Sequence, residues 1–278
     1  MSSFLASEVM RSALFPSTLI AIVASSMSVM VLAHRLAFLA VGVSHATLAG
    51  LGLAVVLALP LLPTAAVTAI IVSMMLASMP RQRGLDTDAG TGVLFAGAMA
   101  LGIILISTAN QYKVDMFGLL FGNILMVSEN DKYWLMWGSG LVFASLIWAA
   151  RSWWSIAFDA SAAEASGLAV YRYRVLLYAA MGLTVVVCVR LSGIVLTAGL
   201  LVLPAASAWF WGRGLFKIWL ISLLVSLTGT WAGLFLSYML DWPSGATVVL
   251  TLCACFVLSW TGSWLNQVIV KHSLGKTS

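Results

Sequence analysis

Long apolar stretches separated by short polar stretches dominate the hydropathy pattern of this chain. A helix needs ~20 mainly apolar residues to cross the hydrocarbon core of a bilayer. Because the hydrocarbon holds no water to satisfy backbone polar groups, such stretches must be helical there. The pattern predicts membrane-spanning helices at 13–33, 41–60, 62–79, 91–108, 133–150, 175–190, 193–210, 218–240 and 245–265.

Two apolar segments differ from a simple spanning helix. The segment 193–210 contains Gly193, Gly199 and Pro204, which favour a broken or kinked helix. The run Met116–Ser128 is too short to span and is typical of a partial or re-entrant helix. The sequence therefore predicts an all-α, polytopic integral membrane protein with eight or nine transmembrane helices.

Composition agrees with this pattern and excludes several functions. Hydrophobic residues make up 62% of the chain and charged residues 8%, against about 25% charged residues in soluble domains. No polar stretch is long enough for a soluble domain, so residues 1–278 are predicted to form a single transmembrane domain. No Gly-x-x-x-x-Gly-Lys-Ser/Thr loop is present, so the chain is not expected to bind ATP itself. Basic residues are scattered through loops, which gives no support for nucleic-acid binding.

The basic residues predict how the chain is oriented. If the loop Arg151–Arg174 faces the cytoplasm, alternation of the spans places ten basic residues inside and four outside. The inner residues are Arg35, Arg81, Arg83, Arg151, Arg172, Arg174, Arg213, Lys217, Lys271 and Lys276; the outer ones are Arg11, Lys113, Lys132 and Arg190. This asymmetry follows the positive-inside rule.

His45 is the clearest ionisable residue inside a predicted span, and Ser44 and Thr47 lie beside it. Ionisable side chains at membrane depth are costly, so they are functional candidates. Neutral imidazole is a good ligand for zinc, manganese or iron. The alternative is a packed histidine bonded to a backbone carbonyl. His45 and the neighbouring Ser44 are thus candidates to line a metal pathway.

Other ionisable residues lie at span ends. Asp115 and Asp241 are predicted at outer ends, where either could attract cations into an entrance or simply be solvated in a loop. His34 and His272 stand beside Arg35 and Lys271 and are predicted to be solvated interfacial residues. No buried Ser/His/Asp set or His-Glu-x-x-His motif suggests an intramembrane enzyme.

A loop at about 155–172 contains the segment Phe158–Leu168, in which Ala and Glu favour a short helix. Asp159 can cap the start of this helix and Gly167 can end it. A short exposed helix between two spans can dock into a groove on another protein. The alternative is a plain connecting helix.

Six segments in order resemble the permease subunits of bacterial zinc/manganese ABC importers. They are Arg35–Gly50, Asp88–Gly102, Val114–Ser128, Phe158–Leu168, Ser192–Ala208 and Asp241–Val249. The resemblance implies a metal-type ABC importer permease fold, a homodimer in the bacterial inner membrane, two cytoplasmic ATPase subunits that hold ATP, and an extracellular or periplasmic metal-binding protein. It implies no permanently bound cofactor.

The same resemblance implies roles for particular residues. The loop at 155–172 would couple to the ATPase, with Asp159, Glu164 and Gly167 in the coupling element, and the metal would cross the dimer interface past the helix that holds His45. Many members have an Asp four residues before this His, where the present chain has Val41. Imidazole without a carboxylate favours zinc over manganese or iron. Val41 also leaves open a different second ligand, transient binding, or a metal chelate or other small solute as the substrate.

Overall fold

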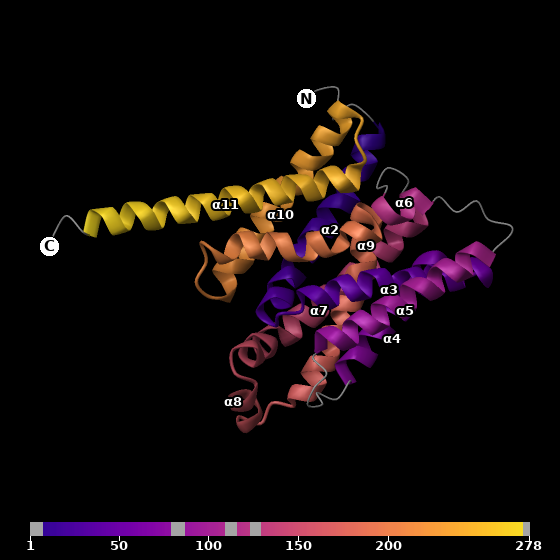
Figure 1. The fold of residues 1–278 in the computed structure, drawn as a ribbon, viewed down its shortest axis with the longest axis horizontal. Coiled ribbons are helices and arrows are strands. Elements are labelled where there is room, and N and C mark those ends of the chain that lie inside the picture. The colour runs from indigo at the N-terminus through magenta and orange to yellow at the C-terminus, as the bar shows by residue number, and fades with distance from the viewer. Residues whose placement is uncertain (1–7, 79–86, 109–115, 123–128, 275–278) are drawn as a thin grey trace.

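The computed structural model describes residues 8–78, 87–108, 116–122 and 129–274, and these contain helices and turns but no β-strand. The helices follow one another in the order of Figure 1. They are α2 (Glu8–Ala33), α3 (Ala37–Val56), α4 (Leu61–Ser78), α5 (Thr87–Thr108), α6 (Met116–Phe121), α7 (Glu129–Phe158), α8 (Ala160–Ala165), α9 (Val170–Trp209), α10 (Leu215–Leu240) and α11 (Ser244–Leu274).

All nine predicted spans are present in the described part of the chain as helices long and apolar enough to cross a membrane. Most boundaries agree within a few residues. The largest difference is in α7, whose apolar part runs over Asp131–Phe158 rather than ending at residue 150. The charge of Arg151 predicts the end of the span, but Trp153 is fully buried, so the helix continues against the protein past this residue. α6 confirms a short helix at the start of the run 116–128; residues 123–128 lie outside the described residues.

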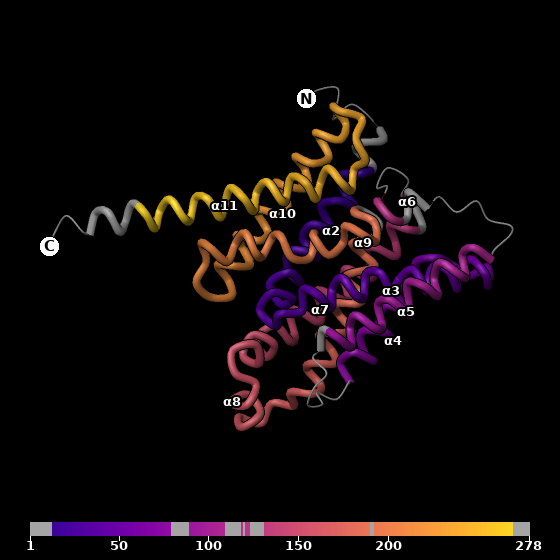
Figure 2. The backbone as a smooth tube through the Cα atoms, in the orientation of Figure 1, coloured from indigo at the N-terminus to yellow at the C-terminus, as the bar shows by residue number. Residues whose placement is uncertain are grey.

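α9 is a helical hairpin rather than one long helix. Gly193 has φ 74° and ψ 172°, a conformation that ends one helical half and redirects the chain into the next. Tyr173, near the start of α9, stacks on Trp148, and Trp209, at its end, packs against Trp154 of the same helix α7. Both ends of α9 therefore lie at the end of the molecule where α8 is found, while Gly193 contacts α6 at the opposite end (Figure 2). The predicted break is confirmed.

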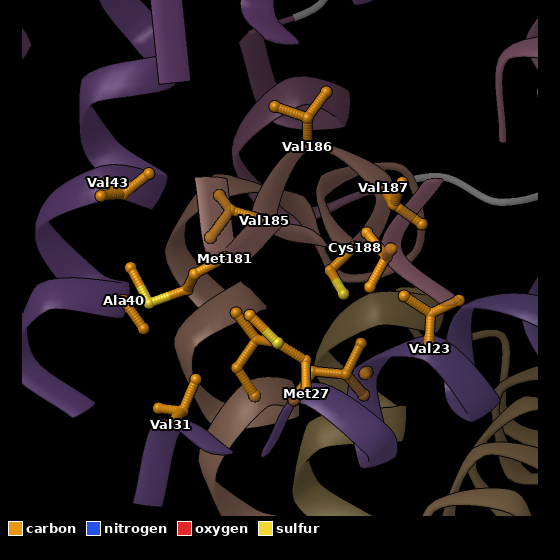
Figure 3. Close-up of a cluster of buried hydrophobic side chains, with 14 of the residues drawn as sticks. Val23, Met27, Val31, Ala40, Val43, Met181, Val185, Val186, Val187 and Cys188 are labelled. Atoms are coloured by element: carbon orange, nitrogen blue, oxygen red, sulfur yellow. The ribbon is translucent and has the colours of Figure 1, made fainter. Parts of the chain in front are cut away.

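The core lies around the first half of α9. Met181, Val185 and Cys188 are buried between α2 and α3, where they meet side chains such as Met27 and Val43 (Figure 3). α4 packs on the same part of the molecule, α10 packs against α2 and α9, and α11 packs against α9 and α10. In contrast, α5 and α11 bury only 17% of their spanning windows. The C-terminal part of α11 extends away from the other helices (Figure 1).

Hydroxyl groups join α2 to α10 inside the core. Ser222 donates to the carbonyl oxygen of Ser25 at 3.2 Å, and Ser226, one turn later, donates to that of Ala21 at 2.9 Å. In addition, Trp219 donates its indole N–H to Ser26 at 3.0 Å. Because lipid gives helices no hydrophobic reason to associate, close packing and hydrogen bonds of this kind hold membrane helices together.

Basic residues flank the turns at the α8 end. Arg35 follows α2, Arg151 lies near the end of α7, Arg172 and Arg174 lie in the first turns of α9, and Arg213 lies between α9 and α10. The alternation of helices therefore agrees with the orientation predicted from sequence, in which this end is cytoplasmic.

Candidate metal pathway and coupling helix

α3 holds His45 in its third turn, inside the span Ala37–Val56. The imidazole is half-buried, while the neighbouring Ser44 and Thr47 are buried. Both hydroxyls bond within the helix, Ser44 Oγ to the carbonyl oxygen of Val41 at 2.8 Å and Thr47 Oγ1 to that of Ser44 at 2.5 Å. Of these three polar side chains, the imidazole is therefore the one that keeps bonding capacity for a passing ion.

The carbonyl oxygen of Val41 sets the tautomer of His45. It lies 3.0 Å from His45 Nδ1, and a carbonyl can only accept a hydrogen bond, so Nδ1 carries the hydrogen. The neutral ring then has its lone pair on Nε2, for which no hydrogen bond is found within the described part of the chain. Metal-ligating histidines commonly bond their other nitrogen in this way, which fixes the orientation of the ring. The expected bond to a backbone carbonyl is therefore present at Nδ1, and the ligand role stays a prediction for Nε2.

Phe95 of α5 forms one wall beside this imidazole. The two rings meet edge to face at 89°, with centroids 4.8 Å apart. The contact depends on a close crossing of α3 and α5, because a side chain at Gly102 would lie 2.6 Å from the backbone of Leu48. Sequence analysis did not identify Phe95, since an aromatic residue in an apolar span carries no distinguishing pattern. Phe95 therefore packs directly against the imidazole ring of His45.

His45 does not belong to a larger cluster of metal-ligating side chains in the described part of the chain. Among the described residues no group of three or more His, Cys, Asp or Glu side chains could hold a metal ion together. Val41, one turn before His45, adds its carbonyl oxygen to the network but has no carboxylate. One imidazole makes a weak site, which suits a pathway from which the ion must also leave.

α8 is a short, exposed helix with a defined end on each side. Asp159 Oδ1 accepts hydrogen bonds from the amides of Ser161 at 2.9 Å and Ala162 at 3.0 Å. At the other end Gly167 has φ +89°, and its amide and that of Leu168 bond back to the carbonyls of Glu164 and Ala163. This Schellman motif needs a left-handed residue, which glycine adopts without strain. The predicted cap and terminator are confirmed.

The outward face of α8 is available for contact. Ala163 is its only buried residue, and Glu164 and the flanking Asp159 and Gly167 are exposed. Phe158, the last residue of α7, is 76% exposed and is separated from α8 only by Asp159. A short exposed helix with small side chains is compatible with both predicted alternatives, a docking element and a plain connection.

Replacing Asp159 with alanine is expected to fray α8 without unfolding the spans. The substitution removes both capping bonds, and the loss of an N-cap costs ~1 kcal/mol. Hydrogen exchange at the amides of Ser161 and Ala162 should accelerate about fivefold, while exchange in α9 stays unchanged. Asp159→Asn keeps an accepting oxygen and is the control. Equal exchange in the alanine variant and the wild type would contradict this description of α8.

The other ionisable residues singled out in the sequence have separate outcomes in the structure. Asp115 lies outside the described residues. Asp241 is exposed and is the left-handed C-cap of α10 at φ 52°; its role at an outer entrance stays a prediction. The prediction for His34 was wrong: the side chain is half-buried and its Nε2 donates to the carbonyl oxygen of Trp153 at 2.9 Å. Burial lowers the pKa of His34, against a smaller opposing effect of this hydrogen bond. The side chain of His272 lies outside the described residues.

In the described part of the chain, nine helices are long and apolar enough to span a membrane, which defines a multi-pass membrane protein. The sequence matches the model of the ABC 3 transport family over residues 6–263. The chain therefore belongs to the ABC 3 transport family, which confirms the resemblance seen in the sequence.

Three relatives illustrate the family. The manganese transport system membrane protein MntC of Halalkalibacterium halodurans is 28% identical and covers 96% of this chain and 91% of its own. The manganese import system permease protein ScaB of Streptococcus parasanguinis is 29% identical, with 90% and 89% covered. A probable iron transport system membrane protein of Haemophilus influenzae is 26% identical, with 91% and 93% covered.

Solved structures share the fold. PsaBC from Streptococcus pneumoniae, in complex with Fab, superposes with a TM-score of 0.84 at 25% identity and covers 93% of this chain and 95% of its own. A putative metal-chelate type ABC transporter in an inward-facing conformation gives a TM-score of 0.68 at 16% identity, with 91% and 89% covered, and shows the fold alone. The predicted fold class, an all-α permease of the ABC importer type, is thereby confirmed.

Proposed function

We propose that this chain is the permease subunit of an ABC importer that takes up a divalent transition-metal ion across a bacterial inner membrane. The observation that carries the proposal is His45, an imidazole held inside a span with Nδ1 bonded to the Val41 carbonyl and Nε2 left free for a ligand. Membership of the ABC 3 transport family and the printed names of the relatives support a metal as the transported ion.

The donor chemistry and the relatives favour different metals. A single imidazole without a neighbouring carboxylate favours zinc, which accepts nitrogen ligands readily, over manganese, which prefers oxygen. Val41 supplies no carboxylate to this site. The names of two relatives refer to manganese and that of a third to iron. Zinc is therefore the first candidate from the site, and manganese is the second from the family.

Transport in this proposal is alternating access at a homodimer interface. Residues 1–278 form one permease domain, and the loop at about 155–172, with α8 at its centre, docks into a cytoplasmic ATPase subunit on each copy. The capped, outward-facing α8 and the exposed Phe158 support this role. ATP binds and is hydrolysed on the partner chains, a metal-binding protein delivers the ion from outside, and the ion passes His45 between the two accessible states.

ATPase activity of the permease–ATPase complex in nanodiscs tests the proposal. The complex is assayed with the binding protein loaded with zinc, loaded with manganese, or empty. Stimulation by zinc-loaded protein alone supports the zinc assignment, and stimulation by manganese-loaded protein alone replaces zinc with manganese. If neither loaded protein stimulates the complex but a metal chelate does, the substrate is a chelate and the proposal of a free ion is wrong.

A further inference from the structure

A buried tryptophan joins the end of α7 to the start of α9, the two helices that flank α8 in the chain. Trp153 of α7 is fully buried, and its indole N–H donates to the carbonyl oxygen of Tyr173 in α9 at 2.8 Å. The ring of Tyr173 also stacks on Trp148, with centroids 5.6 Å apart. A displacement of α8 must therefore move the ends of α7 and α9 together.

His34 bonds to the same tryptophan from a third element. Its Nε2 donates to the carbonyl oxygen of Trp153 at 2.9 Å, so this one residue connects α7 both to α9 and to the turn between α2 and α3. We call His34, Trp153 and Tyr173 the α8 base. Sequence analysis placed His34 in solvent because it stands at a span end beside Arg35, and no sequence pattern indicates its partner.

The turn that holds His34 is short and closed by hydrogen bonds. His34 directly follows α2, and the amides of Arg35 and Leu36 bond back to the carbonyls of Leu32 and Val31 at 3.1 and 2.8 Å. Arg35 takes the left-handed position of this Schellman motif at φ 58°, and α3 begins at Ala37. Because so few residues separate His34 from α3, a displacement of the His34 imidazole is transmitted to the first turn of α3.

Two routes connect α8 with the helix that holds His45. α9 packs against both α8 and α3, so its body is one route. The other is the α8 base, which runs from α7 through Trp153 and His34 into α3. α8 itself packs against α7 and α9 rather than against α3.

We propose that His34 is a positioning residue for transport, which links the movement of α8 to α3 and so to His45. This inference rests on the proposed function, because it assumes that an ATPase subunit moves α8. The geometry of the bond supports it: the carbonyl of Trp153 can only accept, so Nε2 of the half-buried His34 donates to it, and burial lowers the pKa of His34, which disfavours the charged ring.

The test measures metal ions taken up per ATP hydrolysed by the full complex in proteoliposomes, with the loaded binding protein present. His34→Phe keeps a ring of similar size but removes the donor, and His34→Gln restores an N–H donor at similar reach. The loss of a linking hydrogen bond should lower uptake per ATP about fivefold in His34→Phe, and His34→Gln should recover most of it. Melting temperature and metal binding by the permease alone should stay near the wild-type values.

Three outcomes would overturn the inference. In the first, His34→Phe keeps the wild-type ratio, which assigns coupling to the body of α9. In the second, His34→Gln fails as His34→Phe does. In the third, uptake and ATP hydrolysis fall in proportion with the melting temperature, which is a structural role. If His34→Phe is not recovered folded, His34→Asn, which is too short to reach the Trp153 carbonyl, replaces it. A wild-type complex without metal-dependent uptake would instead count against the proposed function.

Discussion

Replacing His45 with alanine is expected to lower metal-dependent uptake by at least about tenfold, because the change removes the ligand nitrogen while even loss of a ligand's supporting partner costs 10–100-fold in metal affinity or activity. The chain should still fold. The imidazole is half-buried and bonds to the backbone of its own helix, so its loss costs at most ~1 kcal/mol of stability. Uptake at subsaturating metal and the melting temperature in detergent measure the two effects.

Ser44→Ala is the matched control for this experiment. Ser44 bonds to the same Val41 carbonyl, yet its hydroxyl is buried and already satisfied. Uptake should change less than about threefold in this variant.

Val41→Asp provides the opposite test, because a carboxylate four residues before His45 lies on the same helical face and should tighten metal binding. Wild-type uptake by His45→Ala would remove His45 from the pathway.

Gly193→Ala is expected to prevent stable folding of the chain. Gly193 has a backbone conformation at φ 74° and ψ 172° that is essentially restricted to glycine. A Cβ there would also overlap the carbonyl oxygen of Leu120 and the amide nitrogen of Gly122, which are backbone atoms that cannot rotate away. Strain and overlap together should cost about 3 kcal/mol or more. The measurement is the fraction of solubilised protein that elutes as a single species on size-exclusion chromatography.

Gly140→Ala is the control for the glycine experiment. Gly140 is exposed in α7 and a Cβ there meets no atom within 4 Å. Alanine in a helix interior is about 1 kcal/mol more favourable than glycine, so this variant should elute like the wild type or better. A Gly193→Ala variant with the wild-type melting temperature would show that α6 and the turn of α9 do not pack as described.

The spans could be predicted from sequence because lipid imposes one physical rule on every residue in them. Length and apolarity alone fix where a helix crosses, and Gly193 predicts the break in α9 because few other residues accept its conformation. The end of α7 could not be predicted in this way. Trp153 continues the helix past Arg151 through burial and two hydrogen bonds with distant parts of the chain, and such contacts leave no local pattern.

The residues of the candidate site could be predicted from sequence, but the groups that contact them could not. An ionisable residue inside an apolar span is conspicuous, so His45 could be identified, and Asp159 and Gly167 follow from the rules of helix ends. The partners of these residues could not be identified from sequence. The tautomer of His45 depends on the Val41 carbonyl, and Phe95 reaches the ring only because α3 and α5 cross closely. His34 was misplaced for the same reason, since its partner is 119 residues away in sequence.

The measurement that tests the central proposal most directly is ATP-dependent metal accumulation in proteoliposomes that contain this chain and its ATPase partner, with the loaded binding protein outside. We expect accumulation of zinc or manganese that requires ATP and falls by at least about tenfold in His45→Ala. Vesicles that hydrolyse ATP but accumulate neither ion, or that accumulate them equally without ATP, would contradict the assignment of this chain as a metal importer permease.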